Sequence, residues 1–341
     1  MKIFRVLGLP CWLLLALTAS PCFSQTYAVT DLGTVPGMDW SVARAINSAH
    51  QITGASGKSN ANLDDVFLYS NGTMTNLGTL GGSSGVGNGI NAFGQVAGYS
   101  QNANGTYRAF VSNGGRLTDI GDLGGGSAVA YAINDLGQVV GSSVTSGHAN
   151  HPFLYSNGQM IDLGTLGSPD GNSWWNSAQG INNQGAVTGT SYDADGNFFG
   201  FVWSSGTMTK LGTLGGPWSQ GYAINNKGQV TGNAYTANGN SHAFITTRRG
   251  KMKDLGTFAG KFSTLWGSGI NDSGVVVGQS TFQDTYHAFV YRGGKITDLN
   301  TLIPPGSGWE LIEAAGINNA GEIVGLGIRH GLEHAYLLTP Q

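Results

Sequence analysis

The sequence predicts an all-β fold: a seven-bladed β-propeller of four-stranded antiparallel blades, closed by pairing of the N-terminal and C-terminal strands. Three observations predict it. One phrase recurs seven times at intervals of 43 to 48 residues, each copy reads as four short strands, and the two chain ends each hold part of one copy. A period of this length indicates a supersecondary unit that buries its apolar face only by stacking on its copies.

Each copy carries three marks: an Ile-Asn pair, an aromatic residue, and a Leu-Gly-Thr-Leu type phrase with a polar residue before it. The Asn residues are Asn47, Asn91, Asn134, Asn182, Asn225, Asn271 and Asn318. The aromatic residues are Phe67, Phe110, Phe153, Phe201, Phe244, Phe289 and Tyr336. The phrase is led by Asp31, Asn76, Asp119, Asp162, Lys210, Asp254 and Asp298. We expect the Ile before each Asn to lie in the core between blades.

The copy from residue 223 to residue 256 shows the expected elements in order. Residues 223–225 form a short apolar run, 229–233 alternate in polarity, 242–246 form a third run and 251–256 a fourth. Turn residues separate all four, which is typical of an antiparallel meander. No segment has sustained helical periodicity with caps, so we expect almost no helix.

The turns have their own signatures. Asn-x-x-Gly follows the first strand in six copies, while the first copy has His50 where Gly is expected. An Asn side chain bonds its own backbone two residues on, and Gly adopts the positive φ that closes a hairpin. Asn-Gly pairs at 71–72, 113–114 and 157–158 mark the turn between the third and fourth strands.

Two features favour a closed ring over an open array. Small residues surround the first strand, as expected for strands crowded at an axis: Ala43, Ala45, Gly87, Gly89, Ala130, Ala132, Ala178 and Gly180. After the first two dozen residues, which are read below as an export signal, the chain opens with residues 27–35, a fourth strand without its first three, and it finishes with residues 334–338, a third strand without its fourth. Together the two ends complete one blade and hide the sheet edges.

The first residues read as an export signal. Lys2 and Arg5 precede an apolar run from Leu7 to Leu17, and small residues near Ser24 suit cleavage before Gln25. We therefore divide the chain into a signal peptide, 1–24, and one propeller domain, 25–341. The predicted location is secreted, either extracellular or periplasmic, and the alternative is a lipoprotein attached through Cys22.

Composition limits the partners. Both cysteines, Cys11 and Cys22, lie in the signal, so the mature chain is expected to have no disulfide and no thiolate metal site. Loss of Lys2 and Arg5 changes the formal net charge from −3 to −5. Without a cluster of Lys and Arg, we expect no nucleic-acid partner. No apolar stretch beyond the signal is long enough to cross a membrane, so we expect no membrane span. We also expect no cofactor and a monomer.

The repeat resembles a known family. His-Ala-Phe at 242–244 and 287–289, Asp-Leu-Gly-Thr-Leu at 162–166 and Ile-Asn-Asn-x-Gly-x-Val at 224–230 are similar to the HAF-repeat family of exported bacterial proteins. The resemblance covers the mature chain, although several copies depart from the tripeptide, such as Arg108-Ala109-Phe110 and His151-Pro152-Phe153. It implies secretion and a repeat β-fold, and it implies no activity.

The links between blades, where the sequence is least uniform, suggest a binding face. We expect them to share that face with the loops between second and third strands. Six of the seven mature tryptophans are assigned to the links: Trp40, Trp174, Trp175, Trp218, Trp266 and Trp309. Aromatic rings beside short polar side chains suit sugar or peptide binding. The alternative is that the rings fill gaps between blades.

Other candidate sites are weaker. His242, His287 and His334 hold one repeat position and would spread among blades, so we interpret them as structural, and we found no obvious carboxylate partner for His151 or His334. The Asp that leads the Leu-Gly-Thr-Leu type phrase, which we call the positional acid, is replaced by Asn76 and Lys210 in two copies. This variation suits a hydrogen bond at the end of a strand. Residues 193–197 resemble a calcium loop but lack its distal Glu.

The sequence therefore predicts an exported, non-enzymatic binding module that takes a glycan or a protein on an aromatic loop face. One alternative is a polysaccharide-active hydrolase or lyase using two facing carboxylates, which glycoside hydrolysis requires. Its candidates are Asp39, Asp170, Asp193, Asp195, Glu310 and Glu313. A second alternative is a structural protein of the cell surface or matrix.

Overall fold

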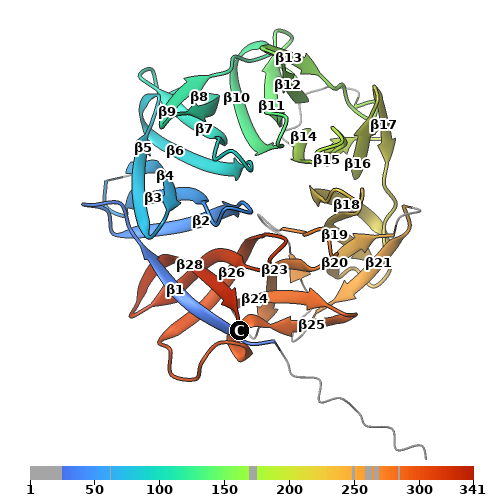
Figure 1. Ribbon diagram of the computed structural model, residues 1–341. Coiled ribbons are helices and arrows are strands. Elements are labelled where there is room, and N and C mark those ends of the chain that lie inside the picture. Colours follow the sequence, from blue (N-terminus) through green and yellow to red (C-terminus); the bar gives the residue numbers. More distant parts are fainter. Residues whose placement is uncertain are drawn as a thin grey trace, which may run out of the picture.

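The structure is a computed structural model that describes residues 25–61, 63–168, 175–247, 250–257, 263–264, 269–282 and 285–341. Seven four-stranded antiparallel units surround a central axis, as Figure 1 shows. A single parallel pairing, Asp64 with Ser84, joins the first two units into one hydrogen-bonded sheet. The predicted fold class is confirmed. The signal peptide, with both cysteines, lies outside the described residues.

The blades follow one another along the chain. Blade 1 consists of β2 (Trp40–Ile46), β3 (Ile52–Lys58), β4 (Leu63–Ser70) and β5 (Thr73–Gly78). Blade 2 consists of β6 (Gly81–Ile90), β7 (Val96–Asn102), β8 (Tyr107–Asn113) and β9 (Arg116–Asp119). Blade 3 consists of β10 (Gly124–Ile133), β11 (Val139–Thr145), β12 (Asn150–Ser156) and β13 (Gln159–Asp162). Blade 4 consists of β14 (Ser177–Ile181), β15 (Val187–Tyr192), β16 (Phe198–Ser204) and β17 (Thr207–Lys210).

The remaining blades include the closing one. Blade 5 consists of β18 (Gly215–Ile224), β19 (Val230–Thr236), β20 (Ser241–Thr246) and β21 (Met252–Gly256). Blade 6 consists of β22 (Ser263–Thr264), β23 (Val276–Phe282), β24 (Thr285–Arg292) and β25 (Lys295–Asp298). Blade 7 consists of β26 (Trp309–Ile317), β27 (Ile323–Arg329), β28 (Leu332–Pro340) and β1 (Tyr27–Gly33). The helix in the described residues is a short 3-10 turn, η1 (Leu299–Thr301).

The ring closes through strands from the two ends of the chain. Strand β1 pairs antiparallel with β28, from Tyr27 opposite Pro340 to Gly33 opposite Ala335. Asp31 adds a clamp, because its carboxylate accepts hydrogen bonds from Arg329 at 2.7 Å and bonds His334 at 3.0 Å. The predicted closure is confirmed (Figure 1).

The first strand of each blade lies nearest the axis. Successive first strands contact one another, as β2 does with β6 and β26. A Cβ added to Gly89 would lie 3.1 Å from the Ala132 Cα, and one added to Gly180 would lie 3.0 Å from the Ala223 Cα. The small residues are therefore needed for close approach of neighbouring blades.

The repeated Ile and aromatic residues fill the space between blades. Phe67, Phe110, Phe153, Phe201, Phe244, Phe289 and Tyr336 are fully buried. Six of the seven repeated Ile residues are buried, and Ile270 is partly buried. Each Ile belongs to a separate apolar cluster between blades, which confirms the predicted core.

The turns behave as the sequence predicts. Asn71 and Gly72 both have positive φ, as do Asn157 and Gly158. His50 takes the left-handed conformation, with φ of 60°, that Gly adopts in the other copies. Its Nδ1 lies 2.6 Å from a Glu322 oxygen in blade 7, so this departure from the pattern adds a contact across the closing seam.

Candidate functional site in the propeller axis

A β-bulge in the first strand creates the most distinctive feature of the axis. In six blades the pairing of first and second strands skips one residue. A bulge re-aims the side chain of the extra residue. The extra residues, which we call the bulge ring, are Arg44, Asn88, Tyr131, Gln179, Tyr222 and Ala315. The first strand of blade 6 lies largely outside the described residues.

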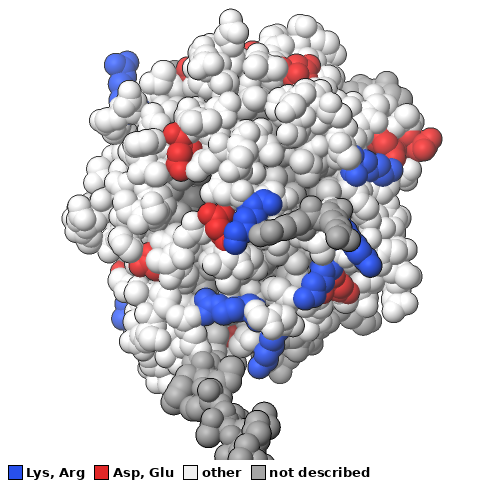
Figure 2. Space-filling view, turned by 45° about the vertical axis from the view of Figure 1, so that its right-hand side comes forward, with Lys and Arg blue, Asp and Glu red and all other residues white. Residues whose placement is uncertain are grey.

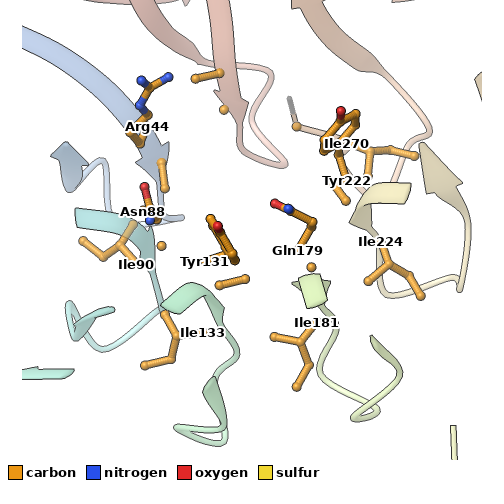
Figure 3. Close-up of a pocket in the computed structure, with 18 of the residues that line it drawn as sticks. Arg44, Asn88, Ile90, Tyr131, Ile133, Gln179, Ile181, Tyr222, Ile224 and Ile270 are labelled. Atoms are coloured by element: carbon orange, nitrogen blue, oxygen red, sulfur yellow. The ribbon is translucent and has the colours of Figure 1, made fainter. Parts of the chain in front are cut away.

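The bulge ring faces the axis, while the repeated Ile residues face the blades. Figure 3 shows Asn88, Tyr131 and Gln179 pointing into the central space and Ile90, Ile133, Ile181 and Ile224 pointing away from it. A bulge leaves no room for a side chain on the strand opposite. A Cβ on Gly54 or Gly98 would collide with the carbonyl oxygen of Val42 or Val86. The glycine repeated in every second strand is therefore a consequence of the bulge.

Hydrogen bonds fix three of the ring side chains. Asn88 Nδ2 donates to the Ala130 carbonyl of the next blade at 2.8 Å. Gln179 Nε2 donates to Ser177 Oγ at 2.9 Å, and the Tyr222 hydroxyl donates to Gln220 Oε1 at 2.6 Å. These bonds use donors, so the side-chain carbonyl oxygens of Asn88 and Gln179 remain as acceptors at the axis.

Arg44 forms an ion pair across the closing seam. Its Nη1 lies 2.9 Å from Glu313 Oε1, and the Glu313 side chain is 10% exposed. Burial raises the pKa of Glu313 above its ordinary value, although the Arg44 charge and hydrogen bond act in the opposite direction. The pair is neutral when both groups are ionised, so the guanidinium does not make the axis electropositive.

The bulge ring separates two cavities along the axis. The outer cavity, which we call the funnel, has a volume of about 540 Å³ and is lined also by Trp40, Tyr99, Trp175 and Glu333. The inner cavity has a volume of about 250 Å³ between the Ile-bearing ends of the first strands. Arg44, Asn88, Tyr131, Gln179 and Tyr222 line both. The funnel has the size of a small-molecule site.

Two tyrosines of the ring have their pKa raised by burial. Burial raises the pKa of Tyr131 to about 12, and Tyr99 adds to the effect. Burial also raises the pKa of Tyr222. A tyrosine is already neutral at physiological pH, and burial extends the neutral form of both groups to still higher pH. The Tyr131 hydroxyl makes no hydrogen bond to any residue that the structure describes.

A row of stacked aromatic rings runs from the funnel across the boundary of blades 4 and 5. Trp175 lies 6.3 Å from Phe198, Phe198 lies 4.8 Å from Trp218, and Trp218 lies 4.0 Å from Tyr235, between ring centroids. Tyr192 flanks Phe198 at 5.6 Å. We call these five residues the aromatic row. Trp175, which is 50% exposed, belongs to both the row and the funnel.

The backbone beside Trp175 is anchored. Asn176 is fully buried, and its Oδ1 accepts from Ser191 Oγ and the Tyr192 N–H, both at 3.0 Å. Its carbonyl accepts from Ser142 Oγ in the neighbouring blade at 3.1 Å. Trp175 is therefore an exposed ring on a fixed support.

The predicted tryptophans do not form one loop surface. Trp40 and Trp309 begin β2 and β26, and Trp218 lies within β18, so their assignment to the links is wrong. The first strands begin earlier than the apolar pattern indicates, because Gly-rich residues extend the pairing outward. A Cβ on Gly57 would collide with the Trp40 ring, and one on Gly327 would lie 2.9 Å from Trp309 Cε3, so both rings pack against strands. Trp174 and Trp266 lie outside the described residues.

The repeated histidines have carboxylate partners that sequence spacing did not indicate. His151 lies 2.8 Å from Asp162, His242 lies 2.9 Å from Asp254, His287 lies 2.8 Å from Asp298, and His334 lies 3.0 Å from Asp31. Each of these pairs joins a third strand to a fourth strand. The structural interpretation of the histidines is supported, and the expectation of no carboxylate partner for His151 and His334 is wrong.

The positional acid also caps the end of its strand. Its carboxylate accepts from the N–H two residues on, as Asp162 does from Gly164 at 2.8 Å. In residues 193–197, the segment that resembles a calcium loop, the Asp193 carboxylate accepts hydrogen bonds from the Asn197 N–H and from Lys210 Nζ. Within the described residues no group of three His, Cys, Asp or Glu side chains could hold a metal ion.

Four of the described carboxylates that were candidates for hydrolysis lie against other protein groups. Asp39 accepts from Ser59, Asp193 pairs with Lys210, and Glu313 pairs with Arg44. Glu310 lies 3.8 Å from His287 Nε2. Asp170 lies outside the described residues.

Sequence reasoning missed the bulge ring, although a signal was present. The position two residues before the repeated Ile is Arg, Asn, Tyr, Gln and Tyr in the first five copies, Ser in the sixth and Ala in the seventh, whereas the residues on either side of it are Ala or Gly. In five copies a large polar residue therefore stands inside the most uniform strand, which indicates a side chain that does not pack in the core.

The comparisons show the fold class alone. No family model matches this sequence, and no curated protein matches it. The chain is similar in structure to a puromycin-hydrolyzing peptidase of Mycobacterium tuberculosis, with a TM-score of 0.55 and 12% identity over 92% of this chain and 51% of that one. It is also similar to the extracellular domain of the one-component system BT4673 from B. thetaiotaomicron, with a TM-score of 0.54, 11% identity and coverage of 92% and 40%.

A third similar structure is TolB from Acinetobacter baumannii, with a TM-score of 0.51, 12% identity and coverage of 85% and 63%. The chain thus spans less than two thirds of the length of each of these proteins. Together they define a distant similarity to β-propeller proteins. Among the described residues, no helix is long and apolar enough to cross a membrane.

Proposed function

We propose that this chain is an exported binding module that takes a glycan at the funnel and the adjoining aromatic row. The observation that carries the proposal is Trp175: a half-exposed ring, fixed by Asn176, backed by stacked rings and placed at the mouth of a cavity of about 540 Å³. An exposed aromatic face packs against the CH groups of a sugar, and nearby polar groups bond its hydroxyls.

Most rings of the aromatic row hold Trp175 in place and do not themselves present a face to a sugar. The rings of Phe198 and Trp218 cover each other, since their planes are 29° apart at 4.8 Å. This arrangement favours Trp175 as the ring that contacts the sugar. Phe198, Trp218 and Tyr235 then support Trp175 by stacking behind it. The proposed contact is therefore one ring, Trp175, in place of a face of six equivalent tryptophans.

Charge and sequence support the rest of the assignment. On the face drawn in Figure 2, basic and acidic side chains are interspersed and most of the surface carries neither charge, which favours an uncharged partner over nucleic acid. Residues 1–24 support export, and the repeated phrases support membership of the HAF-repeat family. We propose a secreted monomer without a cofactor.

A depletion assay tests the proposal. Residues 25–341 are mixed with a panel of insoluble bacterial and plant polysaccharides, and the protein left in solution is measured. We expect one polysaccharide to deplete the protein, and we expect Trp175→Ala to stay in solution. Trp203→Ala is the control, because the partly buried Trp203 packs against the apolar cluster between blades 3 and 4 and does not belong to the row. Failure of every polysaccharide would favour a protein partner.

A further inference from the structure

We infer that the bulge ring is a subsite for a single neutral sugar residue, which sits at the base of the funnel. The inference deepens the proposed glycan binding and rests on it. It names the part of the glycan that enters the axis and the chemistry that selects it.

The polar groups at the ring match the hydroxyl groups of a sugar. One N–H of Asn88 and one of Gln179 donate to protein atoms at 2.8 and 2.9 Å, which orients both amides and leaves their carbonyl oxygens as acceptors. The Tyr131 hydroxyl makes no hydrogen bond to any described residue, and it both donates and accepts. A sugar hydroxyl also donates and accepts, so one monosaccharide can bond several of these groups at once.

The side chains of the wall match the surface of a pyranose. Tyr131 of blade 3 and Tyr222 of blade 5 stand on either side of Gln179 in the ring, and the wall between the ring side chains is Ala, Gly and Ile (Figure 3). The tyrosines add ring faces to the polar groups of Asn88 and Gln179. This combination suits a pyranose, which has apolar CH faces and a polar edge.

The charges around the funnel favour a neutral sugar. Arg44 is paired with Glu313 at 2.9 Å, and the other charged residue lining the funnel, among those described, is Glu333. A uronate would face the Glu333 carboxylate without an uncompensated cation to meet it. A protonated amino sugar would lose the solvation of its ammonium group at a ring whose one described charge, Arg44, is already paired. A neutral sugar avoids both penalties.

Trp175 connects this subsite to the proposed binding surface. It lines the funnel together with Tyr131, Gln179 and Tyr222, and it stacks on Phe198 in the aromatic row. A glycan chain lying along Trp175 can therefore place its end in the bulge ring.

The test uses small methyl glycosides. Residues 25–341 are titrated with methyl glucoside, galactoside, mannoside and xyloside, and in parallel with a methyl glucuronide and a glucosamine glycoside, by saturation-transfer NMR. We expect one neutral glycoside to bind, and we expect Tyr131→Phe to weaken it roughly fivefold or more, which corresponds to one hydrogen bond. Tyr155→Phe, which removes a hydroxyl from the same blade on β12, should leave the affinity unchanged.

Three outcomes would overturn the inference. The first is the absence of binding by every neutral glycoside. The second is tighter binding of the charged sugars. The third is binding that Tyr131→Phe leaves intact while Trp175→Ala abolishes it, since the sugar would then occupy the row alone. Depletion by an insoluble polysaccharide can survive each of these outcomes, so failure of the subsite is distinct from failure of the proposed function.

Discussion

Each blade joins its third and fourth strands through a pair of side chains whose identities change together. Four blades use His with Asp, and blade 2 uses Arg108 with Asp119 at 2.8 Å. Blade 1 has Asp65, which accepts from Asn76 at 2.7 Å. In blade 4 Lys210 lies 3.3 Å from the centroid of the Phe199 ring, as a cation–π pair. The replacement of Asp by Asn76 and Lys210 is therefore explained by the residue opposite.

A transplanted pair tests this interpretation. We expect His242→Phe and Asp254→Lys, made together in blade 5, to reproduce the blade 4 pair, because the introduced ammonium group would then lie over an aromatic face. Each single change should destabilise the protein, and the double variant should recover about 0.5 to 1 kcal/mol through coupling between the two sites. Denaturant unfolding of the four proteins measures the coupling free energy. A coupling of zero would show that the two positions act independently.

At the scale of the element, the sequence predicted the strands and turns but not the bulge. Turn chemistry is local, so Asn-x-x-Gly and Asn-Gly indicate hairpins directly. The bulge depends on pairing between strands, and the glycine opposite it reads as an ordinary strand residue. For the same reason the apolar pattern placed the start of β18 too late and assigned Trp218 to a link. The axial ring of side chains could not be predicted without that register.

Glycine opposite the bulge gives a sharp prediction at this scale. We expect Gly98→Ala to lower the free energy of unfolding by about 3 kcal/mol, because the new Cβ would collide with the Val86 carbonyl oxygen. Neither residue can shift easily to relieve the collision, since both lie in paired strands. Gly212→Ala is the matched control, since no atom lies within 4 Å of its added Cβ. Chemical denaturation compares the two, and equal stability of the variants would contradict the steric account.

The whole molecule is closed twice. At its rim, β1 completes the seventh blade. Near its axis, the seven repeated Asn side chains form a circle, in which each Nδ2 donates to the carbonyl oxygen of the next Asn at 2.9 to 3.2 Å and Asn318 returns to Asn47. The sequence indicated these Asn residues as turn formers. The circle joins residues more than forty positions apart, so no local pattern reveals it.

Breaking the circle should be costly. Asn182 is buried, donates to the Asn225 carbonyl at 3.0 Å, and accepts from the Gln184 and Ala186 N–H groups. We expect Asn182→Ala to cost roughly 2 to 4 kcal/mol, because it leaves buried partners unsatisfied. The neighbouring Asn183 bonds Asp135 at the exposed surface, so Asn183→Ala should cost roughly 1 kcal/mol or less. Equal losses in thermal or denaturant unfolding would refute the distinction.

The closing blade should be sensitive to acid. Partial burial acts to raise the pKa of Asp31, but hydrogen bonds from Gly33, Arg329 and His334 outweigh it and hold the pKa below its ordinary value of 3.8. The unfolded chain then binds this proton more readily, so the stabilisation is present above that value and is lost as the pH falls through it. We expect the difference in Tm between the natural protein and Asp31→Asn to be largest near pH 7 and to shrink toward pH 3. A constant difference would exclude the carboxylate as the clamp.

The central claim is that a glycan binds where the aromatic row meets the funnel, and a tryptophan fluorescence titration tests it most directly. Residues 25–341 are titrated with soluble polysaccharides, beside Trp175→Ala, Trp218→Ala and Trp203→Ala. The account predicts a saturable change with one polysaccharide, lost in Trp175→Ala, weakened in Trp218→Ala and kept in Trp203→Ala. The absence of a change with every polysaccharide, or a change that survives in Trp175→Ala, would contradict it.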